Sequence, residues 1–467
     1  MREISVVIPT HNRAQLVTKH LFKLTEQPLA AENLQAIVVA DGCTDDTATL
    51  IRRLVLPYRI KVLQQNPGLG AAAARNRGAT AATSGVILFF DDDMEPGRDL
   101  LKAHVECHRA NPGSVVLGYF PMHPPETGES PFTKFARLWW AEKFAARSSP
   151  DYRFSFYDLC TGNVSIAKDV FEGIGGFDVS IGKVGAGEDY ELGYRLIRRR
   201  VRFVFSREAA SIHHSGITSK VNLRRAREDG YGHSTIVRKH PELFWEFKVS
   251  RLSRLANIKS LRPLWVALWK YPALSDIPIA GFGVMARLVF AINGQRLYWK
   301  MHSILNAHAY WRGARDGFGC LENWERFVRA NPPYEPVGCR EVDLEVTRDL
   351  DDLDEFIRKN GPADAIRVLV TGEPVGRIDP WPPGEALTSQ HLRTQLVAKF
   401  SAFLPGELLS RRNSRTSVAR AKSTVAQAAI ATAFVPIAVK PVHVNSAQRK
   451  LLSGTPAPVN GSQAGPT

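Results

Sequence analysis

The stretch Val86–Asp93, with the sequence VILFFDDD, decides the fold that we predict for this chain. Its first five residues are all apolar, as in a short strand that is buried on both faces of a sheet. The three adjacent carboxylates that follow repel one another, so a cation or hydrogen-bond donors must compensate them. A solvated acidic turn is the simpler interpretation. We favour a ligand site, because ligands of open α/β sheets bind outside the carboxyl ends of the strands.

Further strand and helix patterns precede this stretch. Apolar runs at residues 4–8, 36–40 and 60–64 predict strands, and apolar residues at helical spacing between 13 and 27 predict a helix after the first of them. Strands that alternate with helices in this way predict a parallel sheet with helices on both faces. We therefore expect an α/β domain over residues 1–245.

Polar and glycine residues follow these strands. Asp41 ends the second strand, where its carboxylate could accept hydrogen bonds from a base or a ribose, although a plain turn residue is the alternative. After the third strand, a turn at Gly70 opens a helix of small residues, which can lie close to the sheet and whose N-terminus favours anions. Arg75 adds positive charge there. The spacing of the glycines matches neither the dinucleotide fingerprint nor the P-loop.

The composition indicates a globular protein with anionic partners. At 467 residues the chain is long enough for about two or three structural units. Its hydrophobic content of 44% and charged content of 23% are typical of folded proteins. The formal charge of +15 suits nucleotide phosphates, nucleic acid or an acidic membrane surface. Because the basic patches lack a matching recognition motif, we expect no nucleic-acid partner.

The cysteines and the apolar stretches indicate the cellular compartment of the protein. The five cysteines are scattered and form no close metal-type pair, which fits a reducing compartment. The N-terminus begins a strand at once, so we expect no secretory signal. No uninterrupted apolar stretch reaches the roughly 18 residues of a spanning helix; the nearest, Ile277–Ile292, is interrupted by Arg287. We expect a cytoplasmic protein, which could also bind peripherally to the inner face of the cell membrane.

Several ordered motifs in this region resemble those of family 2 glycosyltransferases. They are VVIPTHNR at Val6–Arg13, DGCTDDT at Asp41–Thr47, the glycine turn and helix at 70–78, and the acidic cluster at 91–96. The resemblance runs from Met1 to about Lys239, which is about half of the chain. It implies a GT-A fold, with a mostly parallel nucleotide-binding sheet flanked by helices. It also implies an inverting enzyme that uses a nucleotide-diphosphate sugar in a single in-line displacement.

The resemblance further implies a divalent metal, Mn²⁺ or Mg²⁺, which would stabilise the charge that grows on the leaving diphosphate. Asp91 and Asp93 match the family's DXD motif. Asp93 is our first choice as direct ligand, with Asp91 assisting it or touching the ribose. His213 or His214 would complete the metal site, because a neutral imidazole is a suitable partner of oxygen ligands on manganese. The spacing from the preceding alanine pair favours His213.

The segment before a second amphipathic helix carries the pair Glu188 and Asp189. The pair could simply cap the helix, whose dipole favours carboxylates at its N-terminus. The resemblance implies that Asp189 is the catalytic base, which would take the proton of the acceptor hydroxyl. Glu188 would orient the base or contact the acceptor. The resemblance places these residues against the nucleotide sugar: Pro9, Thr10, Asn12, Arg13, Asp41, Gly70, Arg75, Asn76, Asp91, Asp92, Gly162 and Asn163.

The remaining chain divides into three parts. Residues 246–330 are basic, aromatic and helical in pattern. The interpretations that stay open are a surface that lies on an anionic bilayer, and a helical subdomain that packs on the catalytic domain or forms a lid over the acceptor site. We favour the bilayer because many relatives in the family act on lipid-linked acceptors. Residues 340–404 predict a small acidic α+β unit. Residues 405–467 predict a mostly disordered tail.

From the resemblance we predict transfer of a sugar, from a UDP-linked donor, to a hydroxyl of a saccharide or lipid-linked acceptor in cell-envelope or exopolysaccharide synthesis. A nucleotidyltransferase is one alternative, but it would need a basic phosphate-binding loop that Pro9–Asn12 does not supply. A non-catalytic nucleotide-binding or scaffold protein of a polysaccharide assembly complex is the other. Such a protein would lose its acids, whereas Asp41, Asp91, Asp93 and Asp189 are all present.

Overall fold

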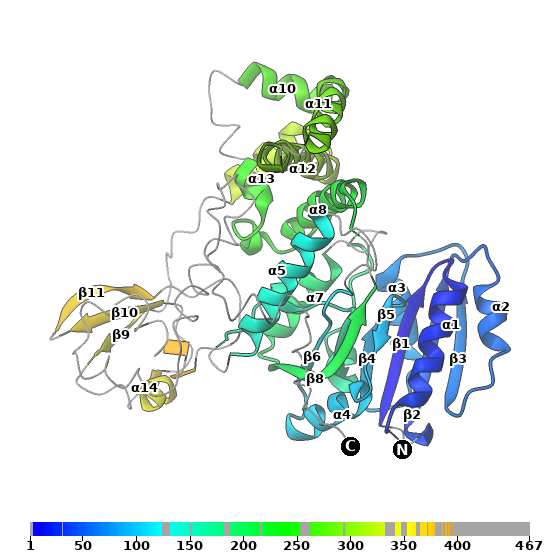
Figure 1. Cartoon of the computed structure of the whole chain (residues 1–467). Helices are drawn as coiled ribbons and strands as arrows, with labels where there is room; N and C mark the ends of the chain where they lie inside the picture. The colour runs from blue at the N-terminus through cyan, green and yellow to red at the C-terminus, as the bar shows by residue number, and fades with distance from the viewer. Residues whose placement is uncertain are drawn as a thin grey trace, which may run out of the picture.

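The structure, a computed structural model, has a main body built on a large sheet, a stack of helices on that body, and a small second sheet (Figure 1). It describes residues 3–29, 31–123, 131–149, 152–181, 187–214, 217–252, 262–292, 295–331, 341–346, 353–360, 365–370 and 372–378, together with 385, 388, 389, 391, 392 and 396. The tail that we predicted at 405–467 lies outside the described residues.

The main sheet has eight strands in the order β3-β2-β1-β4-β7-β6-β8-β5. The first four of these are parallel. In the second half, β7 runs antiparallel to both β4 and β6, β8 is parallel to β6, and β5 is antiparallel to β8. The α/β fold class is thus confirmed. The strands are β1 Ile4–Thr10, β2 Leu34–Asp41, β3 Arg59–Gln65, β4 Val86–Phe90, β5 Met94–Pro96, β6 Val115–Tyr119, β7 Asn163–Ala167 and β8 Phe203–His213.

Helices cover both faces of this sheet, because alternate residues of its strands feed two hydrophobic cores. Leu88 and Phe90 join the core under α1, α2 and α4, whereas Ile87 and Phe89 join the core under α3, α6 and α7. Helix α3 lies especially close to the sheet: a Cβ on Gly78 would come within 2.3 Å of a Val7 methyl group. The helices are α1 Ala14–Lys23, α2 Thr47–Arg52, α3 Ala71–Thr80, α4 Leu100–Ala110, α5 Pro131–Arg147, α6 Lys168–Gly173 and α7 Glu188–Arg198.

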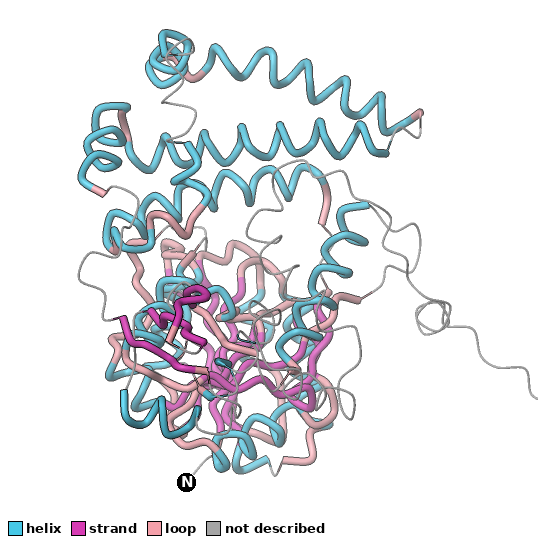
Figure 2. Tube along the Cα trace, turned by 90° about the vertical axis from the view of Figure 1, so that its left-hand side faces the viewer, coloured by secondary structure: helices cyan, strands magenta, loops and turns pink. Residues whose placement is uncertain are grey.

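Long helices after the sheet stack beside one another on one side of the strands (Figure 2). Helices α8 and α12 make the closest contact, since a Cβ on Gly313 would lie 1.8 Å from the Arg227 carbonyl oxygen. Trp265 and Trp324 are buried in the core that also holds the α7 side of the sheet. The helical region therefore shares a core with the main body. The helices are α8 Ser219–Lys239, α10 Arg262–Lys270, α11 Ala273–Ala291, α12 Gln295–Phe318 and α13 Leu321–Ala330.

Helix α11 differs from its neighbours in exposing its apolar side chains. Ile277 is 81% exposed and Leu288 is 63% exposed. By length and composition alone, residues 273–290 could cross a membrane, and only 11% of that segment is buried. We predicted no uninterrupted apolar stretch of this length, and the segment does contain Asp276 and Arg287. The helix nevertheless runs continuously from Ala273 through both charged residues, and its average composition is apolar enough for a spanning length.

The small unit consists of a three-stranded sheet in the order β11-β10-β9 with helix α14 beside it. Strands β9 and β10 are parallel, and β11 is antiparallel to β10. Arg367 of β10 forms a bidentate ion pair with Asp343 of β9, with both nitrogen–oxygen distances 2.7 Å. Glu385 contacts the main body, where its carboxylate accepts a 2.7 Å hydrogen bond from the Phe203 amide. The elements are β9 Glu341–Glu345, α14 Leu353–Asn360, β10 Ala365–Val370 and β11 Glu373–Ile378.

Candidate active site

The three aspartates that follow β4 pair with two arginines. Asp91 faces Arg75 of α3, at 2.8 Å between Oδ1 and the guanidinium. Asp92 is buried and lies 2.6 Å from Arg13. Asp93 lies 3.2 Å from the same Arg13 guanidinium. The cations that a packed acidic cluster requires are therefore supplied by the chain itself, one from the loop after β1 and one from α3.

Arg75 holds two distant parts of the chain together. It is 5% exposed, and its guanidinium contacts Asp91 on one side and Glu188 on the other, at 3.1 Å. Asp189 adds negative charge nearby and, with the other two acids, raises the pKa of Arg75 against the effect of burial. One buried cation thus offsets the negative charge of three carboxylates. Two of these come from the N-terminus of α7 and one from the end of β4.

The start of α7 fixes the two acids at this place. Gly187 precedes the helix with a φ of +98°, a backbone conformation that side-chain-bearing residues rarely adopt. Glu188 and Asp189 then fall in the first turn, where the helix dipole favours negative charge. Asp189 is half-buried and accepts hydrogen bonds from Thr161, at 2.8 Å from the hydroxyl and 3.1 Å from the amide.

Burial shapes the proton affinity of this acid pair. It raises the pKa of Glu188 to about 7, with help from the adjacent negative charge of Asp189. It also raises the pKa of Asp189, while Arg75 and Thr161 act in the opposite direction. A carboxylate with a raised pKa is a stronger base than an exposed one. The acids at the start of α7 are therefore suited to proton abstraction.

Asp92 has a supporting position beneath the cluster. Its carboxylate accepts a 2.7 Å hydrogen bond from the Thr10 hydroxyl and pairs with Arg13. Burial raises the pKa of Asp92 to about 6, although Arg13 and Thr10 lower it. Thr10, Arg13 and Asp92 thus tie the end of β1 to the end of β4. Pro9 belongs to β1 itself, in register with Val39 of β2.

Asp93 and His213 offer a place for a divalent metal. The His213 Nε2 atom lies 3.5 Å from Asp93 Oδ1, and no described group bonds to its buried Nδ1 atom. Burial alone would raise the pKa of Asp93, but His213 and Arg13 outweigh it and hold that pKa below its ordinary value. An oxygen and an imidazole nitrogen fit Mn²⁺. Among the described residues, Asp91, Asp93 and His213 do not form a group with ligand atoms within 4.8 Å of one another; His20, Glu95 and His214 do.

Asp41 and Gly70 hold the turn before α3. Asp41 Oδ1 accepts hydrogen bonds from the Leu69 amide and from Gln65, and Oδ2 accepts one from the Gly70 amide at 2.8 Å. Gly70 has a φ of +93° and is the N-cap of the helix. The Asp41 side chain thus shapes the turn before α3, and its predicted contact with a base or ribose stays a prediction.

The predicted asparagines make contacts within the chain. Asn12 accepts a 2.8 Å hydrogen bond from the Thr44 amide, which joins the loops after β1 and β2. Asn76 makes two 2.8 Å hydrogen bonds with the backbone of Phe177. Asn163 is buried, and its amide nitrogen donates to the Ala209 carbonyl at 3.0 Å. Their predicted contacts with the donor would have to be made alongside these bonds.

Gly162 supports Asp91 through its backbone. Its carbonyl accepts a 3.1 Å hydrogen bond from the Asp91 amide. A Cβ at Gly162 would lie 2.5 Å from the Met94 methyl group and 3.4 Å from Asp91 Oδ2, so a larger residue would press on the acid. The neighbouring Thr161, which holds Asp189, was not predicted as a site residue. Its position next to the predicted Gly162 was the signal that could have indicated it.

Parts of this chain are similar to known glycosyltransferases. Residues 5–175 match the model of glycosyl transferase family 2. A validoxylamine A glucosyltransferase of Streptomyces hygroscopicus is 33% identical over 274 residues, which are 52% of this chain and 63% of that protein. A pre-mycofactocin glycosyltransferase of Mycobacterium tuberculosis is 27% identical over 248 residues, which are 52% of this chain and 49% of that protein. The chain thus spans about three fifths of the length of the first of these relatives and about half of the second.

Solved structures resemble the chain more weakly. A mannosyltransferase from Pyrobaculum calidifontis in complex with GDP-Man and Mn²⁺ has a TM-score of 0.44 at 19% identity, over 68% of this chain and 88% of that one. TarS of S. aureus in complex with UDP-GlcNAc has a TM-score of 0.41 at 15% identity, over 72% and 95%.

Proposed function

We propose that this chain, whose residues 5–175 belong to glycosyl transferase family 2, transfers a sugar from a nucleotide-diphosphate sugar to an acceptor hydroxyl. The observation that carries the proposal is that one buried cation, Arg75, contacts Asp91 and Glu188 and lies near the charge of Asp189. A non-catalytic scaffold would gain nothing from an arrangement that buries charge at such cost. The same contacts join the proposed donor side, at the end of β4, to the proposed acceptor side at α7.

In this proposal Asp189 is the base. It is half-buried, its carboxylate is oriented by two hydrogen bonds from Thr161, and burial raises its pKa. The acceptor hydroxyl loses its proton to Asp189 as it attacks the sugar carbon, and the bond from that carbon to the diphosphate breaks in the same step. Glu188 is a positioning residue, because its contact with Arg75 fixes the first turn of α7.

The metal site of the proposal consists of Asp93 and His213, whereas Asp91 forms an ion pair with Arg75. A bound Mn²⁺ or Mg²⁺ would supply stabilisation of the negative charge on the leaving diphosphate. Two protein ligands are sufficient for such ions when phosphate oxygens complete the shell. Arg13, which contacts both Asp92 and Asp93, acts to lower the pKa of each and so favours their charged forms.

For the donor we propose a UDP-linked sugar, and for the acceptor a saccharide or lipid-linked hydroxyl in cell-envelope or exopolysaccharide synthesis. The names of two relatives, a validoxylamine A glucosyltransferase and a pre-mycofactocin glycosyltransferase, refer to different acceptors. The exposed apolar side chains of α11 support the lipid-linked choice, because such a surface can lie in the headgroup region of a bilayer. We accordingly propose peripheral contact with an anionic membrane surface.

The test combines donor binding with transfer. Thermal shifts with a panel of nucleotide sugars, in Mn²⁺ or Mg²⁺, identify the donor by its stabilisation of the fold. Transfer to soluble saccharides and to lipid-linked saccharides is then measured as nucleotide release. We expect Asp189→Asn to bind the donor as the wild type does and to lower kcat by about 10²–10⁴-fold. Asp169→Asn, at the exposed start of α6, is the control.

Two results would contradict the proposal. If no nucleotide sugar stabilises the chain, with metal and with vesicles present, the donor class is wrong. If Asp189→Asn turns over like the control, the base must be sought elsewhere.

A further inference from the structure

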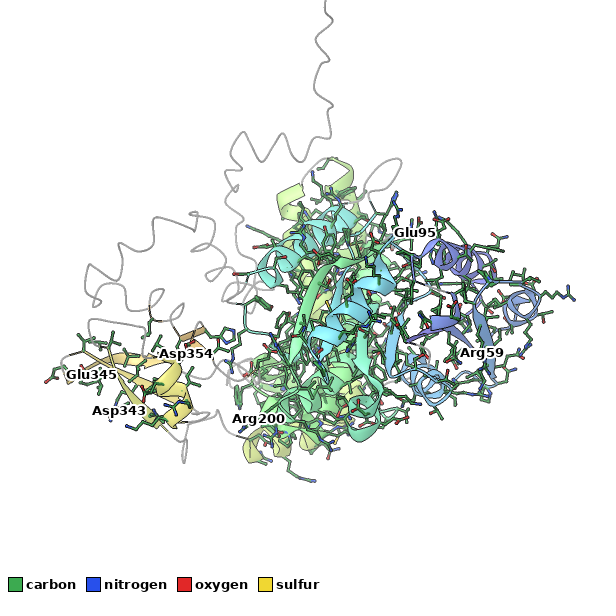
Figure 3. The ribbon with its side chains drawn as sticks, turned by 90° about the horizontal axis from the view of Figure 1, so that it is seen from below. Arg59, Glu95, Arg200, Asp343, Glu345 and Asp354 are labelled. Carbon is green, nitrogen blue, oxygen red and sulfur yellow. The ribbon has the colours of Figure 1, made fainter. Side chains whose placement is uncertain are left out.

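A second group of metal-type side chains lies behind the acidic loop. His20 of α1, Glu95 of β5 and His214, which directly follows β8, each place one ligand atom within 4.8 Å of the others. His214 Nε2 is 2.8 Å from Glu95 Oε2. His213 and His214 are consecutive, and consecutive side chains of an extended segment point to opposite sides. The group is therefore separate from the Asp93–His213 pair. Figure 3 labels Glu95, which lies where the first helix and strands meet the rest of the main body.

His20 points to a ligand that the chain itself does not provide. The side chain is 2% exposed, and its Nδ1 atom lies 2.9 Å from the Asp92 carbonyl oxygen. Because a carbonyl only accepts, Nδ1 carries the hydrogen and Nε2 has a free lone pair. In the described part of the chain, no group bonds to that buried Nε2 atom. Buried polar atoms without a partner are rare, and each one requires an explanation.

We propose that His20, Glu95 and His214 bind a transition-metal ion of the Zn²⁺ class. Two imidazoles and one carboxylate are a common set of protein ligands for zinc, with water in the fourth position. The hydrogen bond from His20 Nδ1 to a carbonyl is the outer-shell contact that orients a metal-binding imidazole. Zinc bonds of about 2.0–2.2 Å hold the ligand atoms roughly 3–3.5 Å apart. Small side-chain rotations from the present separations are sufficient to reach that geometry.

Two neighbouring groups must be reconciled with this site. Lys19 Nζ lies 3.1 Å from Glu95 Oε2, and the ring of His123 stacks on His214 with centroids 5.0 Å apart. A carboxylate has a second oxygen, so Lys19 and the metal can each take one. The arrangement without a metal satisfies Glu95 and His214 through each other but leaves His20 Nε2 unpaired. The metal satisfies all three at once.

The site would have a structural role. Its ligands come from α1, from the strand that follows the aspartates, and from the end of β8, and His20 also bonds to the backbone of Asp92. A bound ion would therefore fix the loop that presents Asp91 and Asp93. The inference does not rest on the proposed function.

The experiment uses the full chain and Zn²⁺ alone. The purified protein is stripped with a chelator, reloaded and desalted, and bound zinc is counted by mass spectrometry without any nucleotide. His20→Asn removes Nε2 but keeps an amide that can donate to the Asp92 carbonyl. His240→Asn is the matched control, because His240 also contacts a buried glutamate, Glu191, outside the group. Asp93→Asn separates this site from the proposed donor metal.

We expect one zinc per chain in the wild type, His240→Asn and Asp93→Asn, and none in His20→Asn. Zinc at a hundredfold excess over its Kd should raise Tm by about 5–10 °C in the first three proteins only. Glu95→Gln provides a second test if His20→Asn fails to fold. Equal zinc binding by wild type, His20→Asn and Glu95→Gln would overturn the proposal. Loss of zinc in Asp93→Asn alone would assign the ion to the donor site.

Discussion

Two regions of the molecule invert the usual distribution of side chains, and they do so in opposite senses. Around Arg75, one cation and the carboxylate of Glu188 are almost completely buried. On α11, Ile277 and Leu288 face outward. Buried charge and exposed apolar surface both cost stability, so each indicates a place that is shaped for something other than folding. The first region suits small charged ligands, and the second suits a broad apolar surface.

The largest effect is expected when the buried cation of the first region, Arg75, is removed. Arg75→Met leaves Asp91 and Glu188 without their shared partner, and we expect a loss of about 3–5 kcal/mol in the free energy of unfolding, as for other broken buried ion pairs. Urea unfolding monitored by circular dichroism measures it. Arg77→Met, on the exposed side of the same helix, should cost less than about 1 kcal/mol. Equal losses in both variants would mean that the buried ion pairs of Arg75 contribute little to stability.

The pH dependence of stability gives the next effect. The pKa of Glu188 is raised from its ordinary 4.5 to about 7. Between these values the folded chain holds a proton that the unfolded chain has lost, so stability falls as pH rises, by at most about 1.4 kcal/mol per pH unit. Glu188→Gln should flatten the profile of unfolding free energy between about pH 4.5 and 7. Glu106→Gln, exposed on α4, is the control, and an unchanged slope in Glu188→Gln would refute the assignment.

Two glycines sharpen the contrast between α12, which is packed, and α11, which is exposed. A Cβ on Gly313 would collide with the Arg227 carbonyl at 1.8 Å, whereas a Cβ on Gly281 of α11 meets nothing within 4 Å. We expect Gly313→Ala to destabilise the chain by about 1–3 kcal/mol. Gly281→Ala should stabilise it by up to about 1 kcal/mol, because alanine favours the helix. Thermal unfolding of both variants tests this, and shifts of the same sign would contradict the contrast.

The smallest effect concerns the outer face of α11. Ile277→Glu and Leu288→Glu should leave Tm within about 2 °C of the wild type, because neither side chain is packed. Binding to anionic vesicles should weaken roughly tenfold for each substitution if the residues enter the bilayer. Sedimentation with vesicles measures it, with Val55→Glu, 94% exposed on the main body, as the control. Equal binding by all three variants would remove α11 as a membrane surface.

The sequence was most informative where local pattern determines structure. The run Val86–Phe90 forms β4 at the predicted residues, and the repeated strand and helix patterns predicted the parallel half of the sheet. Pairing partners are a different matter. Periodicity does not say which strands lie together, so the antiparallel insertion of β7 between β4 and β6 was not predictable.

The site divides in the same way. Arg75 and Glu188 were each predicted from their own motifs, but they lie 113 residues apart and nothing local indicates their contact. His20 lies on the buried side of α1 with Val17 and Leu21, so its position resembles that of an ordinary core residue. Its role as a metal ligand is visible only beside Glu95, which comes from β5, and His214, which directly follows β8. Only the tertiary arrangement brings out that relation.

Arg75 has one further consequence. Because one guanidinium contacts both Asp91 and Glu188, a change of charge at either carboxylate alters the free energy of the other. By thermodynamic linkage, the effect is reciprocal: a ligand that binds at Asp91 changes the affinity at α7 by the same factor as a ligand at α7 changes the affinity at Asp91. A single side chain thereby links the charge at the end of β4 to the charge at the start of α7.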